Sequence, residues 1–168
     1  MTFSTAEMPD QTGHVAIVTG GTAGLGFESV LELARKGCHV IFTARNKARG
    51  EETIPRLKQM LPPAATSIVE NAVADNADLA SIEVFADAFL ARNLPLHILL
   101  LNAGVAFAPY QEIHGVELTL FVNHVAHHLL ATKLLPVLVR SAPSRVVIVS
   151  SGAHGTVKTL DLDLPGDE

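Results

Sequence analysis

A chain of 168 residues is long enough to bury a substantial core, and a single domain over residues 1–168 is the natural expectation. Hydrophobic residues make up 48% of the sequence and charged residues 17%, which predicts a folded α/β protein and excludes a disordered one. The formal net charge of -5 disfavours nucleic acid and anionic membrane surfaces as main partners.

Residue types and their spacing exclude further classes of protein. Cys38 is the only cysteine, so the sequence predicts neither a disulfide framework nor a thiolate metal cluster. The eight histidines are scattered without a metal-ligand spacing, and we expect no metal site. Residues 1–11 are polar and lack a signal-peptide pattern, so they are predicted to form a loose N-terminal arm. No apolar run approaches the length of a membrane span, and a cytoplasmic location is the expectation.

The first predicted elements are a strand and a helix joined by a glycine-rich turn. Residues 14–18 form a short, mostly apolar run, and apolar residues recur at one-face helical spacing over 27–34. Glycines in such a turn let the backbone approach a pyrophosphate, whose charge is stabilised by free amides at the helix N-terminus. The alternative is a tight turn with a close helix–strand contact. The favoured interpretation places a dinucleotide against Gly20, Thr22, Gly24, Leu25 and Gly26.

Strand and helix patterns continue to alternate along the chain. Pro55 should kink the second helix or delay its start. The further strands are predicted over 40–43, 67–73, 98–101 and 145–149, and the further helices over 47–60, 79–89 and about 115–140. Five strands joined by helices indicate a doubly wound parallel sheet, in which ligands bind at the carboxyl ends of the strands.

Arg45 follows the second predicted strand, where the adenosine ribose of a dinucleotide would lie. An acidic residue there would bond the 2′-hydroxyl, whereas a guanidinium offers a fork to a 2′-phosphate. The hydroxyl of Thr22 could bond the same phosphate. The alternative for Arg45 is a solvated side chain in a polar turn.

Two other strand ends carry candidate cofactor residues. Asp75 ends the third strand, where its carboxylate could accept a hydrogen bond from the adenine amino group, although an ordinary turn aspartate is the alternative. Small residues where the backbone would pass close to the cofactor follow the fourth strand, at Asn102, Ala103 and Gly104. That tripeptide alone is only a turn signal.

Several segments together resemble the short-chain dehydrogenase/reductase family in their order and spacing. They are Thr19-Gly20 with Gly24 and Gly26, Asn102-Ala103-Gly104, Asn123 within residues 121–124, and Ser151 within residues 149–151. The resemblance covers residues 12–155 and is nearest to the retinol dehydrogenase and WW-domain oxidoreductase group, on the strength of residues 115–124 and 150–154. It implies a Rossmann-like sheet with strand order 3-2-1-4-5 and an NAD(P)-dependent oxidoreductase.

The resemblance also assigns roles to two polar residues. Ser151 would hydrogen-bond the substrate carbonyl, and Asn123 would hold a water in a proton relay. The alternatives are a turn serine at the end of a strand and a buried asparagine bonded to backbone.

Two departures from the family pattern stand out. Leu101 replaces an asparagine before Asn102, which should leave the cofactor-facing backbone intact. The family's Tyr-x-x-x-Lys, in which the tyrosine is the general acid/base, does not follow Ser151. The only tyrosine, Tyr110, precedes Asn123 and cannot be that motif. We therefore expect a carboxyl-terminally incomplete form that lacks the usual last strands and helices and is inactive by itself.

The favoured hypothesis is the amino-terminal, cofactor-binding portion of an oxidoreductase that prefers NADP to NAD and interconverts an alcohol with a ketone or aldehyde. Its partners would be a small carbonyl or alcohol substrate and, through an exposed sheet edge, further copies of itself. The alternative is a non-catalytic dinucleotide-binding or interaction protein.

Overall fold

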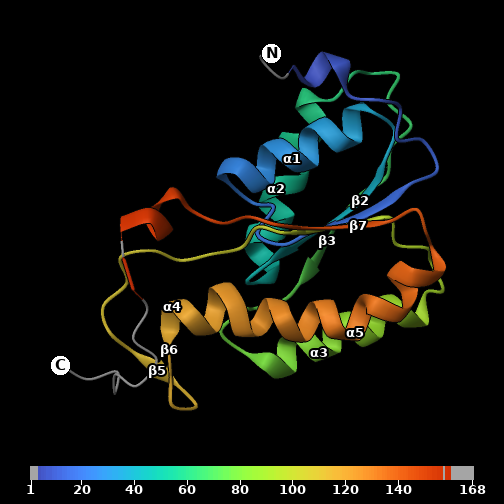
Figure 1. The fold of residues 1–168 in the computed structure, drawn as a ribbon. Helices are drawn as coiled ribbons and strands as arrows, with labels where there is room; N and C mark the ends of the chain where they lie inside the picture. The colour runs from blue at the N-terminus through green and yellow to red at the C-terminus, as the bar shows by residue number, and fades with distance from the viewer. Residues whose placement is uncertain (1–3, 157, 160–168) are drawn as a thin grey trace.

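A five-stranded parallel sheet forms the centre of the protein, as seen in a computed structural model that describes residues 4–156 and 158–159 (Figure 1). The strands lie in the order β3-β2-β1-β4-β7, and every neighbouring pair is parallel. Their bounds are β1 Val15–Val18, β2 His39–Ala44, β3 Val69–Val73, β4 Ile98–Leu101 and β7 Arg145–Ile148. This order confirms the predicted doubly wound sheet, with β7 as its fifth strand.

Helices cover both faces of this sheet. On one face lie α1 (Gly24–Arg35) and α2 (Lys47–Met60), and on the other lie α3 (Leu79–Ala91) and α5 (Ala126–Arg140) (Figure 1). All four residues of β1 are buried, as expected for a strand covered on both sides. Pro55 lies inside α2 without delaying its start. Within the described part of the chain, no helix combines the length and apolar character that a membrane crossing requires.

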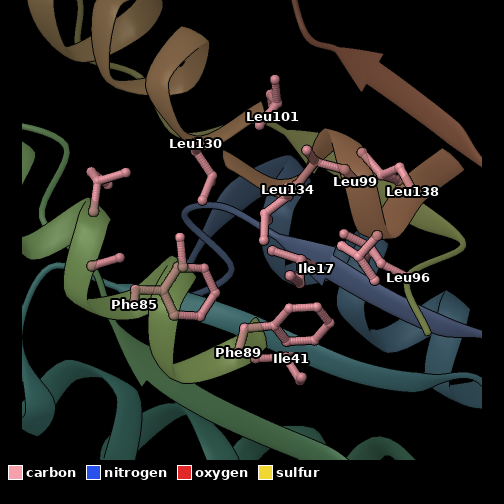
Figure 2. Close-up of a cluster of buried hydrophobic side chains, with 14 of the residues drawn as sticks. Ile17, Ile41, Phe85, Phe89, Leu96, Leu99, Leu101, Leu130, Leu134 and Leu138 are labelled. Atoms are coloured by element: carbon pink, nitrogen blue, oxygen red, sulfur yellow. The ribbon is translucent and has the colours of Figure 1, made fainter. Parts of the chain in front are cut away.

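The hydrophobic core is divided by the sheet into two clusters. Figure 2 shows the cluster under α3 and α5, in which Phe85 and Phe89 of α3 and Leu134 of α5 lie near Ile17 of β1. Alternate residues of the same strands face the second cluster, which includes Ala16, Val18, Val30, Leu31, Phe42 and Leu57. The two clusters therefore cover both faces of the central strands, whose carboxyl ends lie at one edge of the sheet.

The predicted long helix begins later than expected. Instead of a helix from Gly115, a hairpin forms from β5 (Glu112–Ile113) and β6 (Val116–Glu117), and Gly115 lies in its turn with φ +77°. The carboxylate of Glu117 then accepts the backbone N–H groups of the next turn, α4 (Leu118–Leu120). A π-helical turn, η2 (Phe121–Val125), leads into α5. The helical spacing was present, but a left-handed glycine cannot continue a helix.

The amino-terminal segment contacts α1. Part of the predicted arm, residues 1–3, lies outside the described residues, and the short helix η1 (Thr5–Glu7) follows. The Lys36 Nζ donates to the Ala6 carbonyl at 3.0 Å, and the backbone N–H of Gln11 donates to the Lys36 carbonyl at 2.7 Å. These bonds hold the segment beside the end of α1.

β7 lies at the edge of the sheet. In the described part of the chain it pairs with β4 alone, and all four of its residues are exposed. Ile148 has 68% of its surface exposed, and Val149 beside it has 42%. The predicted exposed edge rich in Val and Ile is therefore confirmed for these residues. Ser151 follows, and then the short helix η3 (Gly152–Thr156).

Candidate functional site

A cavity of about 590 Å³ lies at the carboxyl ends of β1, β2, β3 and β4. It brings together seven of the predicted cofactor residues, which are Gly20, Thr22, Arg45, Asp75, Asn102, Ala103 and Gly104. They come from four separate strand ends, so the parallel topology gathers them at one edge of the sheet. This edge is where ligands bind in open α/β sheets.

The glycine-rich turn fits closely against neighbouring backbone. Gly20 has φ +69°, and a Cβ there would lie 2.9 Å from the Cα of Ala103. A Cβ on Gly26 would lie 2.3 Å from the Gly20 carbonyl oxygen. Gly24 also has a positive φ, of +55°, but has open space around it. Leu25, in the first turn of α1, has 72% of its surface exposed. Residues larger than glycine would therefore not fit at Gly20 and Gly26, and the turn exposes its backbone beside the cavity.

Two arginines line the cavity beyond β2. Arg45 is the predicted one, and Arg49 is a second that sequence reasoning missed. The Asn46 side chain caps α2 by accepting the Arg49 backbone N–H at 3.0 Å, which places Arg49 in the first turn of that helix. The Asn46 cap is the signal that could have found it. Together the two guanidinium groups form a positively charged region suited to a phosphate group.

Asp75 has a structural role as well as a place on the cavity. One of its carboxylate oxygens accepts the backbone N–H of Ala77 at 2.9 Å, and its own N–H donates to Ser81 Oγ at 3.0 Å. The turn-aspartate alternative is therefore realised, while the carboxylate keeps acceptor capacity toward the cavity. The turn role of Asp75 is observed, and its contact with an adenine amino group stays a prediction.

The Asn102–Gly104 turn is held against the end of β1 by Thr19. The fully buried Thr19 hydroxyl oxygen accepts the backbone N–H groups of Asn102, at 2.8 Å, and Ala103, at 3.0 Å. In return, the Asn102 Nδ2 donates to the Thr19 carbonyl at 3.0 Å. The turn after β4 is thus fixed by two side chains, that of Thr19 at the end of β1 and that of Asn102 at the end of β4.

The π-helical turn η2 is bonded to two neighbouring segments. The amide of Asn123 accepts the Val105 N–H at 2.8 Å and donates to the Val105 carbonyl at 2.9 Å. The buried Asn76, which sequence reasoning missed, donates to the Val122 carbonyl at 3.0 Å. Asn76 is adjacent to Asp75 at the same strand end, which is the signal that could have found it. These bonds place Asn123 next to Val105, a residue of the cavity wall.

Ser151 and Tyr110 are not among the residues that line the cavity. The exposed Ser151 Oγ accepts the backbone N–H of Ala153 at 3.1 Å. The hydroxyl of Tyr110 donates to the Glu112 carboxylate at 2.5 Å, just before the β5–β6 hairpin. The structure therefore joins Asn123 to the cavity wall and leaves Ser151 beside the end of the edge strand.

The strand order, the glycine-rich turn and the cavity at the carboxyl edge together define a Rossmann-like α/β protein. The sequence model of the short chain dehydrogenase family matches residues 14–159. The chain belongs to this family.

Individual relatives agree with this assignment. Human WW domain-containing oxidoreductase is 43% identical over 146 residues, which cover 86% of this chain and 34% of that protein. Bovine retinol dehydrogenase 12 is 41% identical over 93% of this chain and 49% of its own length. The chain thus spans about a third to a half of the length of these curated relatives. A metagenomic short-chain oxidoreductase solved in complex with NADP is similar in structure, with a TM-score of 0.72 and 25% identity over 94% of this chain and 69% of that one.

Proposed function

We propose that this chain binds NADP in the cavity at the carboxyl edge of the sheet and forms the cofactor-binding part of an oxidoreductase that interconverts an alcohol with a ketone or aldehyde. The observation that carries the proposal is the convergence of the glycine turn, Arg45, Asp75 and Asn102 on one cavity. Family membership and a structural relative solved with NADP support it.

The residues present fit a dinucleotide. The close approach of Gly20 to Ala103 and of Gly26 to Gly20 makes room for a pyrophosphate beside backbone amides. Arg45 and Arg49 would pair with the 2′-phosphate that distinguishes NADP from NAD, and Thr22 would add a hydroxyl. A bound nicotinamide cofactor supplies or accepts the hydride of the reaction.

The remaining proposed roles belong to Ser151 and Asn123. The Ser151 hydroxyl would donate to the substrate carbonyl, and the Asn123 amide oxygen, which has a second lone pair beyond its bond to Val105, would hold a water. The full reaction also needs a general acid/base, and the 168 residues hold only Tyr110 as a tyrosine. Cofactor binding is therefore the part of the reaction assigned to this chain.

Calorimetric titration of the purified chain with NADPH and NADH tests the proposal. We expect one NADPH site and weaker NADH binding. Gly26→Ala should greatly weaken NADPH binding, because its Cβ would meet the Gly20 carbonyl. Gly155→Ala is the matched control, since a Cβ there meets nothing within 4 Å. A folded wild-type chain that binds neither nucleotide would refute the proposal.

A further inference from the structure

A buried histidine links the cofactor-facing turn to the segment that carries Asn123. His127, near the start of α5, has only 5% of its surface exposed. Its Nε2 lies 2.9 Å from the Thr19 hydroxyl oxygen, and its Nδ1 lies 3.0 Å from the backbone carbonyl oxygen of Asn123. The ring therefore spans from the end of β1 to the π-helical turn η2.

The hydrogen-bond partners determine which ring nitrogen carries the proton. A threonine hydroxyl has one proton to donate and two lone pairs to accept with. Both acceptor positions on Thr19 Oγ1 are used by the N–H groups of Asn102 and Ala103. Its proton can then go to His127 Nε2, at 2.9 Å, or to the Leu100 carbonyl, at 3.5 Å, and the shorter contact is the better bond. Nε2 is therefore the acceptor, and Nδ1–H donates to Asn123.

Neutral His127 completes a continuous set of bonds. It begins at the cavity-lining backbone of Asn102 and Ala103, passes through Thr19 and the imidazole, and ends at the Asn123 carbonyl. A second proton on the ring would point at a hydroxyl oxygen whose acceptor positions are already used. Only the neutral ring with its proton on Nδ1 satisfies every group in the set.

We propose that His127 is a positioning residue, which as the Nδ1–H tautomer holds the Asn102–Gly104 turn and Asn123 in fixed relation around the cavity. This inference rests on the proposed NADP-binding function. Burial of the ring lowers the pKa of His127, although the bond to the Asn123 carbonyl acts in the opposite direction, and so favours the neutral form that the geometry requires. Sequence patterns do not indicate this role, because His127 and Thr19 are 108 positions apart.

Two spectroscopic measurements on the full chain test the positioning role without any cofactor. Nitrogen NMR of the histidine rings near pH 7.5 should show His127 protonated at Nδ1 and unprotonated at Nε2. In His127→Phe, the amide signals of Asn102 and Ala103 should shift. The exposed His128→Phe is the matched control and should leave those signals unchanged. A ring protonated at Nε2, or unchanged amide signals in His127→Phe, would overturn the inference.

NADPH affinity supplies the functional measurement. His127→Phe removes both hydrogen bonds of the ring and should weaken NADPH binding by about five- to hundredfold, while His128→Phe should not. His127→Asn retains a donor at the Nδ position and His127→Gln an acceptor at the Nε position, so each should fall between wild type and the phenylalanine variant. These two variants decide the question if His127→Phe does not fold. Equal affinity across the series would contradict the inference, whereas a wild type that binds no NADPH would refute the proposed function and leave the NMR result to judge the positioning role.

Discussion

Three charged side chains line the cavity. Arg45 and Arg49 both line it, and Asp75 faces it from the next strand end. A guanidinium pairs with a phosphate through charge-assisted hydrogen bonds, each worth about 1.5–3 kcal/mol. The choice between NADP and NAD is therefore expected to depend on these few side chains and not on the fold.

Arg45→Asp should narrow or reverse the preference for NADP. We expect NADPH affinity to fall about ten- to hundredfold, because a charge-assisted bond of roughly 1.5–3 kcal/mol is lost and a like charge replaces it. Calorimetry with NADPH and NADH measures the change. Lys47→Asp is the matched control, since Lys47 lies two positions away with the same charge, forms an ion pair with Glu51 and does not line the cavity. Equal or better binding of NADH by the wild type would show that the assignment of Arg45 is wrong.

The isolated 168-residue chain should show no reductase activity above background on simple aldehydes or ketones. Without a positioned general acid, proton transfer loses a factor of about 10²–10⁴. NADPH oxidation followed by absorbance is the measurement. Tyr110 is the one tyrosine, and its hydroxyl is bonded to Glu112. Clear turnover that disappears in Tyr110→Phe would contradict this expectation and make Tyr110 the acid.

At the scale of helices and strands, periodic segments were predictable and irregular ones were not. The sequence predicts α2 with the bounds that the structure shows, because its charged run and its terminating Leu61-Pro62 are local signals. The hairpin over residues 112–117 was missed because Gly115 adopts a left-handed conformation that interrupts the helical spacing. The π-helical turn over residues 121–125 was missed because Asn76 and Asn123 bond to segments distant in sequence. Local periodicity carries no information about such bonds.

The candidate site divides in the same way. Cavity residues such as Arg45 and Asn102 were predictable because they directly follow strands whose carboxyl ends must meet. Thr19 belonged to the recognised turn, but its pairing with His127 depends on how α5 packs against the sheet. Chain order therefore predicts which residues line the site, and tertiary packing decides how they are held.

One charged side chain on the edge strand β3 contacts a neighbouring strand and the end of a helix. Glu70 of β3 contacts His39 of β2 and Arg92 directly after α3, and the hydrogen bond from Arg92 lowers the pKa of its carboxyl. The carboxyl pKa is lower in the folded protein than in the unfolded chain, where it is near 4.5. The ionised carboxylate therefore stabilises the folded state at pH values above 4.5, and this stabilisation is lost as the pH falls through the pKa of the folded protein.

Glu70→Gln should therefore lower the free energy of unfolding at pH 7 by up to about 1 kcal/mol, a modest effect because the side chain is 35% exposed to screening solvent. The difference from wild type should shrink as the pH is lowered below 4.5. Urea unfolding between pH 7 and about pH 3 measures this difference. Glu51→Gln, which removes an exposed ion pair within α2, is the control and should change stability less. A pH-independent difference would argue against the charge as its cause.

At the scale of the whole molecule, the described surface includes exposed apolar side chains on the edge strand and on one helix. The edge strand β7 exposes Val146, Val147 and Ile148, and α5 exposes Leu135 and Val139. An apolar surface gains about 25 cal/mol for each Å² removed from water, and an edge strand with open hydrogen-bonding groups offers a template for pairing. This part of the molecule is the one expected to contact another protein surface.

We predict that the 168-residue chain self-associates at micromolar concentration through this edge. Ile148→Lys should reduce the association, because a charge on an edge strand opposes strand pairing. Light scattering gives the mass and its spread. The matched control is Val84→Lys on α3, where a single valine is 70% exposed and the substitution should have no effect. A monodisperse wild-type monomer that binds no hydrophobic dye would contradict the prediction.

The order of strands in the sheet differs from their order of synthesis, and this has a consequence for the growing polypeptide. β1 is made early, but one of its two neighbours is β4, with Ala16 beside Ile98. At roughly 5–20 residues per second, the ribosome needs about 4–16 s to add the ~80 residues between them. Throughout that interval one flank of the central strand is unpaired, and the candidate cofactor cavity does not yet exist. The cavity is also lined by residues 102–105, Leu118 and Val122, so the proposed cofactor could stabilise the nascent chain only after these residues have been made as well.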